Sequence, residues 1–419
     1  MANWLKHKYS PVGMDLGRTA IRAVQLRRRD HRLHLYSALE LANGGSWDPA
    51  SSSNPEPIVD ETQVISQIKR LRAGGGFIGR DVVIHCPAEK LDMRPVDLPA
   101  SNESLPREAI LGALRLQVGG HLPFPVEQAV FDYLPRQNDG RAGSIRIMAI
   151  TADGQWIKER IGWIESAGMH CIGVDALPCV LSRLSIASSG PEGYFEHLDS
   201  SEPDPLDATD SKCRLRAVLD IGYSGSTLIV HDAQGPLFCR RFALGGLEMS
   251  EILAQRLTVD FPRAEQFKRR FGIDCNSRQL CLAYAAADTK QERADHNPHG
   301  DETIRRPGDP SPQHDLEIGK TIFAALQSEL KDYVEGLTRS LNYVITNYPG
   351  ARLQKLYLAG AAAHTRNLDR YLTDQFELPV HIIAHPLLSK LMDALPATRA
   401  QAGNWTTALG LALKQMEGA

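Results

Sequence analysis

The chain has 419 residues, of which 42% are hydrophobic, and a formal net charge of −3, so it is long enough for two lobes with cores of their own. This charge excludes the overall basic field that is typical of nucleic-acid-binding proteins. Its seven cysteines contain no Cys-x-x-Cys pair, and no apolar run approaches the ~20 residues of a membrane span. We therefore expect a cytoplasmic protein that binds no nucleic acid.

The first predicted elements are two strands that meet at an Asp-x-Gly turn. An apolar run ends in Asp15-Leu16-Gly17, a polar turn follows, and a second apolar run begins at Ala20. This pattern predicts a β-hairpin, with a third strand over 31–38. Glycine lets the backbone approach a ligand closely, and turn amides beside a hydroxyl group can hold a phosphate. An aspartate at the end of such a strand can hold a hydrated Mg²⁺.

A helix and then an inserted module are predicted next. A loop over 43–57 precedes Asp60-Glu61-Thr62-Gln63, whose spacing is that of a capping box at the start of a helix. The run Gly74–Gly79 formally matches Gly-x-Gly-x-x-Gly. It follows a helix and precedes a strand, which is the reverse of the dinucleotide-binding context, so we interpret it as a helix end and a turn. Residues 80–175 are predicted to form a compact α+β module, with strands over 81–86, 91–97, 128–134, 144–151 and 169–175 and helices over 104–119 and 154–167.

A second Asp-x-Gly hairpin opens the second half of the chain. The stretch over 189–212 is rich in Ser, Pro, Asp and Glu and is predicted to be a flexible linker. After it, an apolar run ends in Asp220-Ile221-Gly222, and a returning strand begins near Thr227. Because each half of the chain begins with the same Asp-x-Gly hairpin motif, we predict two lobes that face a shared cleft.

Helices and strands alternate in the remainder of the second lobe. Gly245-Gly246 precedes a helix near 247–257, a basic helix lies around 264–270, and the longest helix runs from about 316 to 347. A strand over 356–359 then ends in Gly360-Ala361, and further predictions are a helix over 367–376, a strand over 380–383 and an apolar helix over 405–413 that packs back on the first lobe. The predicted organisation is a first-lobe core over 1–79, the module over 80–175, a return to the first lobe over 176–188, the linker over 189–212, a second lobe over 213–385 with a polar insert over about 287–315, and a C-terminal segment over 386–419.

Taken in order, these turns resemble a known nucleotide-binding fold. Two Asp-x-Gly hairpins, a Gly-Gly turn before a helix and a late Leu-x-Gly turn are the signature of the actin, Hsp70 and sugar-kinase superfamily. Within it, the chain resembles the PilM family of type IV pilus assembly proteins, which is related to FtsA, and the segment Leu122-Pro123-Phe124-Pro125 is the most specific feature. The resemblance implies an α/β, two-lobed actin-like (RNase H-like) ATPase fold with an inserted α+β subdomain in the first lobe.

The resemblance also implies roles for individual residues in binding ATP and Mg²⁺. Asp15 and Asp220 would position the metal. The residues expected around the phosphates are Gly17, Arg18, Thr19, Arg22, Gly222, Ser224, Gly225 and Thr227, and those expected to frame the nucleoside are Gly245, Gly246, Glu265, Lys268, Gly360 and Ala361. Gly119-Gly120 stand where the family tends to carry an acid and a glutamine. We therefore expect ATP binding with weak or absent hydrolysis, and no catalytic residue is assigned.

The implied partner is the cytoplasmic N-terminal peptide of a PilN-type inner-membrane protein. In the family this peptide lies in a groove between the first lobe and the inserted module, so the chain would be peripheral to the inner membrane through its partners; self-association is left open. Two alternatives belong to the same superfamily. A small-molecule kinase, for example for a sugar, would need a general-base aspartate in the cleft, and an FtsA-like division protein would carry a C-terminal amphipathic membrane helix after a linker.

Overall fold

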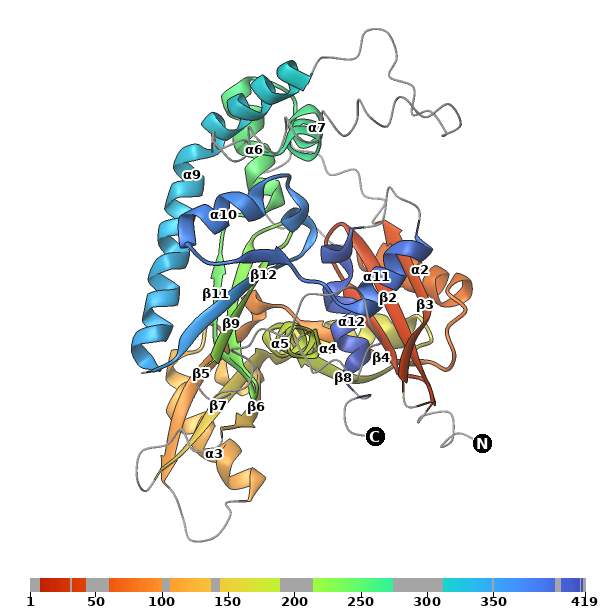
Figure 1. The fold of residues 1–419 in the computed structure, drawn as a ribbon. Helices are drawn as coiled ribbons and strands as arrows, with labels where there is room; N and C mark the ends of the chain where they lie inside the picture. Colours follow the sequence, from red (N-terminus) through yellow and green to blue (C-terminus); the bar gives the residue numbers. More distant parts are fainter. Residues whose placement is uncertain are drawn as a thin grey trace.

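The structure, a computed structural model, describes residues 8–30, 32–42, 60–99, 106–136, 144–188, 214–273, 312–348, 350–395, 401–414 and 416. The expected loop over 43–57, the linker over 189–212 and most of the insert over 287–315 lie outside the described residues. Two five-stranded sheets and one three-stranded sheet organise the described chain (Figure 1). Each five-stranded sheet is the centre of one lobe.

The first lobe is built on a mixed sheet in the order β3-β2-β1-β4-β8. Strands β1 (Val12–Leu16), β2 (Ala20–Arg29) and β3 (Arg32–Ala42) are antiparallel neighbours, whereas β4 (Asp81–Cys86) and β8 (His170–Ala176) run parallel to β1. Helices α2 (Glu61–Gly74) and α4 (Gly154–Ser166) share a core with one face of this sheet. Helices α5 (Leu177–Ala187) and α12 (Thr406–Leu413) cover the other face.

Local sequence signals set the ends of α2 as predicted. The Asp60 carboxylate accepts hydrogen bonds from the backbone N–H groups of Thr62 and Gln63, at 2.9 and 3.4 Å, which satisfies donors that the first helical turn leaves open. At the other end, Gly76 and Gly79 have φ values of 63° and 82°, a conformation that favours glycine. The run from Gly74 is therefore a helix end and turn that leads into β4.

The second lobe repeats the strand order of the first. Its sheet runs β11-β10-β9-β12-β13, where β9 (Arg214–Ile221), β10 (Ser226–Asp232) and β11 (Gly235–Phe242) are antiparallel neighbours, and β12 (Arg352–Ala359) and β13 (Val380–Ile382) run parallel to β9. The shared topology is the structural counterpart of the repeated Asp-x-Gly motif. The helices that pack on this sheet are α6 (Gly246–Leu257), α7 (Phe261–Phe271), α9 (Pro312–Asn347) and α10 (Leu368–Phe376).

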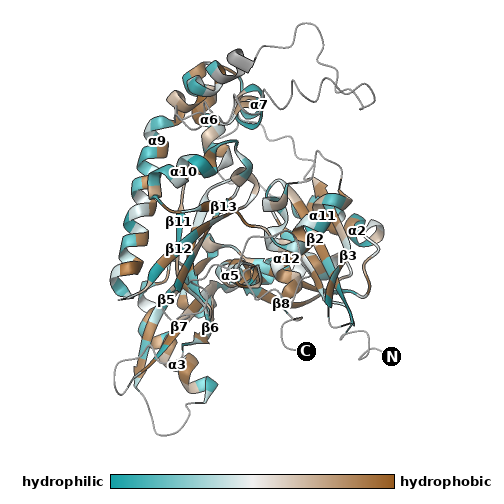
Figure 2. Cartoon of the chain, in the orientation of Figure 1, coloured by the Kyte–Doolittle hydropathy of each residue, from teal (hydrophilic) through white to brown (hydrophobic). Residues whose placement is uncertain are grey.

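Helix α9 matches the long helix predicted for the second lobe. Ile322, Leu326 and Leu330 along its inner side are buried in the second-lobe core. Figure 2 shows hydrophobic and hydrophilic stretches along α9, as expected for a helix with one packed and one exposed side. Helix α9 therefore stabilises the second lobe by the burial of its apolar stripe.

The inserted module is smaller than the sequence predicted. It consists of α3 (Arg107–Val118) and a three-stranded sheet in the order β5-β7-β6, formed by β5 (Leu91–Pro99), β6 (Ala129–Pro135) and β7 (Ser144–Asp153). The prediction for 80–175 also included β4, α4 and β8, but β4 and β8 pair in the first-lobe sheet. Buried Val82, Val83 and Ile84 explain the difference, because a central parallel strand is covered on both faces. We use "the module" below for residues 91–153.

The module is part of the first half of the chain, yet it contacts the second lobe. The Arg136 guanidinium, just beyond β6, forms two hydrogen bonds with the carboxylate of Asp232 at the end of β10, one of them at 3.1 Å. The Arg136 side chain is 1% exposed, so this ion pair is desolvated. Strand β5 also lies against β11, and Figure 1 shows the module directly beside the second-lobe sheet.

Helices α5 and α12 also connect the two lobes. Helix α12 packs on β1 so closely that a Cβ at Gly13 would lie 2.2 Å from the carbonyl oxygen of Ala408, which explains the need for glycine at that position. Helix α5 contacts the second-lobe sheet, where the Ser185 hydroxyl lies 2.9 Å from Nε2 of buried His231. Apolar residues of both lobes share one core around α5 and α12.

Candidate functional site

The two predicted hairpins face each other across one cavity. In β1 and β2, Asp15 pairs with Arg22, and in β9 and β10, Asp220 pairs with Thr227, so the two aspartates occupy equivalent positions in the two sheets. Both carboxylates line a cavity of about 420 Å³. The predicted meeting of the two motifs in a shared cleft is therefore confirmed.

Glycines close to this cavity have no room for a side chain. Gly360, which follows β12, has a φ of 85°, and a Cβ there would lie 2.5 Å from Oδ1 of Asp220. A Cβ at Gly245 would lie 2.2 Å from the backbone nitrogen of Gly225. The turn before α6 and the turn after β9 consequently pack backbone against backbone, which leaves the cavity open.

The ionised form of the Asp220 carboxyl group is disfavoured by its surroundings. Burial raises its pKa to about 7, and the negative charge of Asp15 adds to the effect. A pair of neighbouring carboxylates with this property is suited to a divalent cation, because the cation removes the repulsion between them. Within the described part of the chain no group of three or more His, Cys, Asp or Glu side chains is arranged to hold a metal ion, so a cation here would complete its coordination with water and ligand oxygens.

His85 is a member of this site that the sequence did not reveal. It lies near the end of β4, and its Nε2 is 3.1 Å from Oδ1 of Asp15. Burial alone would lower the pKa of His85, but its hydrogen bond to Asp15 and the charges of Asp15, Asp220 and Glu89 raise it instead. The signal that could have identified His85 is its strand: β4 runs parallel to β1, and the carboxyl ends of adjacent parallel strands meet at one edge of a sheet.

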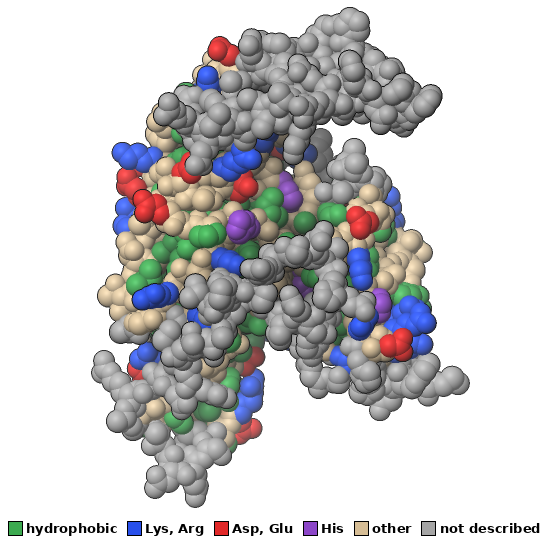
Figure 3. All heavy atoms as spheres, viewed as in Figure 1, with side chains coloured by type: hydrophobic (Ala, Val, Ile, Leu, Met, Phe, Trp, Pro, Cys, Tyr) green, Lys and Arg blue, Asp and Glu red, His purple; other side chains and the backbone are tan. Residues whose placement is uncertain are grey.

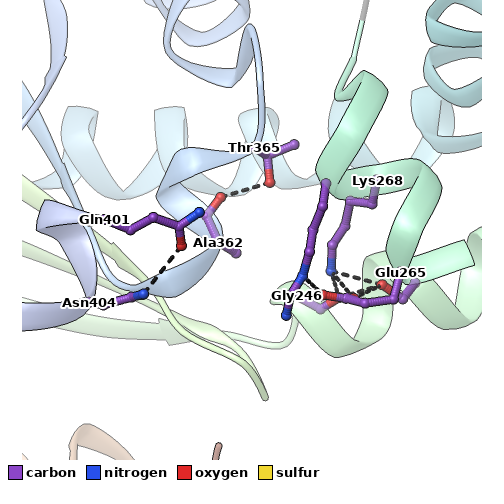
Figure 4. A network of polar contacts seen from close by, with 9 residues as sticks. Gly246, Glu265, Lys268, Ala362, Thr365, Gln401 and Asn404 are labelled. Atoms are coloured by element: carbon purple, nitrogen blue, oxygen red, sulfur yellow. Dashed lines mark hydrogen bonds and ion pairs between the residues drawn. The ribbon is translucent and has the colours of Figure 1, made fainter. Parts of the chain in front are cut away.

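A second cavity of about 290 Å³ shares Thr19, Arg22, Gly222 and Ala361 with the first. Figure 4 shows Glu265 and Lys268 of α7 facing the C-terminal Gln401 and Asn404 across it. The cavity therefore has one wall from the second-lobe helices and another from the segment that returns to the first lobe.

Polar groups on the α7 wall are already engaged with one another. The Lys268 ammonium donates to the Gly246 carbonyl, to Ser250 Oγ at 2.8 Å and to Glu265 Oε2 at 2.7 Å. Burial lowers the pKa of Lys268, although the charge of Glu265 opposes it. For Glu265, burial would raise the pKa, but the charge of Lys268 and the hydrogen bonds from Lys268, Ser250 and Arg269 together outweigh burial, so the pKa is lowered. This network fixes α6 against α7.

The predicted site residues gather at these two cavities, with one exception. Gly245 lines neither cavity and instead supports the turn beside Gly225. Arg22 lines both cavities, but its Nε donates to Glu40 at 2.7 Å. The others that line one or both cavities are Asp15, Gly17, Arg18, Thr19, Asp220, Gly222, Ser224, Gly225, Thr227, Gly246, Glu265, Lys268, Gly360 and Ala361. Their ligand-binding roles stay predictions.

None of the helices that the structure describes combines the length and the apolar character needed to cross a membrane.

Comparisons with known proteins identify the fold and the family. No curated protein matches the chain. Among solved structures, a "PilM-PilN type IV pilus biogenesis complex" is 18% identical, with 97% of this chain and 99% of that chain covered and a TM-score of 0.67. The ethanolamine utilization protein EutJ of Carboxydothermus hydrogenoformans is 14% identical over 97% and 89% of the two chains, with a TM-score of 0.44. MreB5 of Spiroplasma citri bound to ADP is 10% identical over 91% and 95%, with a TM-score of 0.42.

The resemblance of 97% of the chain to the first of these structures confirms the predicted α/β, two-lobed actin-like fold. A family model described as "Type IV pilus assembly protein PilM" matches residues 13–291, which is more than half of the chain. That match includes both Asp-x-Gly hairpins and the whole module. The chain belongs to the PilM family of type IV pilus assembly proteins.

Proposed function

We propose that this protein binds Mg²⁺–ATP between its lobes and, in type IV pilus or related secretion assembly, binds the cytoplasmic N-terminal peptide of a PilN-type inner-membrane protein. The observation that carries the proposal is the position of Asp15 and Asp220. They come from equivalent hairpins of two sheets with the same topology, and they line one cavity. Nucleotide occupancy would then change how far the lobes close.

The residues present fit a magnesium nucleotide. The two cavities adjoin and together have the size range of small-molecule sites. The carboxylates of Asp15 and Asp220 are the hard oxygen ligands that Mg²⁺ favours, either directly or through water. Gly17, Thr19, Gly222 and Thr227 would surround the phosphates, and Mg²⁺ would neutralise part of their charge.

The nucleoside would occupy the second cavity. Glu265 would approach the ribose, and to do so it would exchange its contact with Arg269, whose side chain is largely exposed. Lys268 would act by holding Glu265 and the start of α6 in place, because its ammonium donors are already used. Gly246, Gly360 and Ala361 would form the close-fitting walls.

We propose weak or absent hydrolysis for the same site. Gly119 and Gly120 lie in a short helical turn of the module and line neither cavity, so they offer no side chain to position water. His85, which lines the first cavity, is engaged with Asp15. A nucleotide would accordingly act as a ligand that controls lobe closure.

The partner peptide would bind between the module and the first lobe. Support comes from the PilM–PilN complex, which this chain resembles over 97% of its length. The space-filling view also shows a hollow between the projecting module and the first lobe (Figure 3). Such a peptide would place the protein at the cytoplasmic face of the inner membrane through its partner.

Calorimetry with the purified protein tests both parts. Mg²⁺–ATP should bind wild type, and a synthetic N-terminal PilN-type peptide should bind at micromolar affinity or better, whereas a scrambled peptide should not. The absence of peptide binding with and without Mg²⁺–ATP would refute the assembly role. Transfer of phosphate from ATP to members of a small-molecule library should not occur; such transfer would instead establish the kinase alternative.

A further inference from the structure

Three charged side chains from different parts of the chain meet at the first cavity. Arg18 lies in the β1–β2 turn, Glu89 lies in the short η2 turn (Ala88–Lys90) after β4, and Arg241 lies on β11 of the second lobe. Arg18 Nη2 is 4.0 Å from Glu89 Oε1, and Arg241 Nε is 3.9 Å from Glu89 Oε2. Each oxygen of one carboxylate therefore faces an arginine from a different lobe.

Arg241 is oriented toward the predicted phosphate turn of the second lobe. It pairs with Thr227 across the β10–β11 ladder, and its Nη2 donates to the Ser224 carbonyl at 3.1 Å. Its neighbour Arg240 faces the opposite side of the strand, where Nη1 donates to Ser340 Oγ of α9 at 3.2 Å. The alternation of side chains along a strand thus brings one arginine to the cavity and keeps the other away.

The contacts of Glu89 with the arginines are long and partly exposed. At 3.9 and 4.0 Å they exceed hydrogen-bond distance, and ion pairs of this kind stabilise proteins little. Glu89 is nevertheless close enough to Asp220 for its charge to raise the pKa of that carboxyl group. The Glu89 carboxylate thus lies between two arginine side chains that it holds only weakly, so these arginines can exchange it for another anion.

We propose that Arg18 and Arg241 bind the terminal phosphate of a nucleoside triphosphate, and that Glu89 holds their place when that phosphate is absent. This inference rests on the proposed nucleotide site. A terminal phosphate offers more oxygens and more negative charge than one carboxylate, and guanidinium groups bind phosphate with matched, charge-assisted hydrogen bonds. Arg18 and Arg241 would therefore distinguish ATP from ADP. Because they come from different lobes, both lobes would contact the same terminal phosphate.

Affinities of variants for ATP and ADP with Mg²⁺, measured by calorimetry, test this inference. Arg241→Gln should weaken ATP binding roughly ten- to a hundredfold, the range for losing a hydrogen bond to a charged group, and should leave ADP binding nearly unchanged. Arg18→Gln should do the same. Glu89→Gln should strengthen ATP binding severalfold, because the competing charge is removed. Arg240→Gln, on the same strand but outside the cavity, is the matched control and should change neither affinity.

The outcomes separate this inference from the proposed function. Wild type that binds neither nucleotide would refute the proposed function and this inference with it. A different result would refute only the terminal-phosphate assignment: wild type binds both nucleotides, but Arg241→Gln weakens ATP and ADP binding equally or weakens neither. Weaker ATP binding by Glu89→Gln would refute the competition by Glu89. ADP binding by each variant also verifies that the cleft is folded.

Discussion

The neutralisation of Asp220 should stabilise the ligand-free protein while it removes a metal ligand. Its carboxyl pKa is raised from 3.8 to about 7, by burial and then by the charge of Asp15. Because the folded state disfavours the ionised form, this residue lowers the free energy of unfolding as pH rises from about 4 to 7. This loss in the free energy of unfolding is absent in strong acid; it is about 2 kcal/mol at pH 5 and about 4 kcal/mol at pH 8.

Asp220→Asn keeps the size of the side chain and removes this penalty. Urea unfolding followed by circular dichroism, without nucleotide or Mg²⁺, should give a variant that is more stable than wild type, by more at pH 8 than at pH 5. Asp132→Asn is the matched control, because that carboxylate lies on an exposed position of β6. A variant that is no more stable than wild type at pH 8, or a difference that does not change with pH, would refute the electrostatic reasoning.

Three further predictions concern the cleft and the contacts between lobes. Asp15→Ala combined with Asp220→Ala should weaken Mg²⁺–ATP binding without unfolding the chain; unchanged affinity by calorimetry would contradict the proposed metal site. Arg136→Met leaves the Asp232 carboxylate without its buried partner and should lower the free energy of unfolding by about 3–5 kcal/mol, whereas Arg136→Met with Asp232→Leu should lose less; an equal loss in urea titrations would count against the pair. Burial lowers the pKa of His231 to about 4, so its neutral imidazole contributes stability that is complete above pH 6.5 and falls by about 3 kcal/mol as pH drops to 4. In His231→Gln that part of the acid sensitivity should disappear, and an unchanged pH profile would show that another group causes it.

Features encoded by neighbouring residues could be predicted from the sequence. The hairpins at Asp15 and Asp220, the cap at Asp60 and the long apolar stripe of α9 each depend on residues a few positions apart, and the structure has all of them. The turn glycines were predictable for the same reason. Gly360, for example, has a positive φ directly after a buried strand.

Features that depend on distant pairing could not be predicted in the same way. The module was predicted to include β4 and β8, which belong to the first-lobe sheet. The apolar runs of these two strands fit either sheet, and only the pairing of β4 with β1 and β8 decides between them. His85 lies beside Asp15 for the same reason, because β4 pairs with β1. Glu89 and Arg241 are far apart in sequence, and no local pattern indicates that they meet.

The Arg136–Asp232 ion pair bears on how the proposed partner peptide would respond to lobe closure. The module is covalently continuous with the first lobe at both ends but is fastened to the second lobe by a desolvated ion pair. If nucleotide binding rotates the lobes as proposed, this ion pair would make the module move with the second lobe, and the displacement would fall on the short junctions at residues 87–90 and 153–154. The width of the hollow between the module and the first lobe would then change with the angle between the lobes (Figure 3).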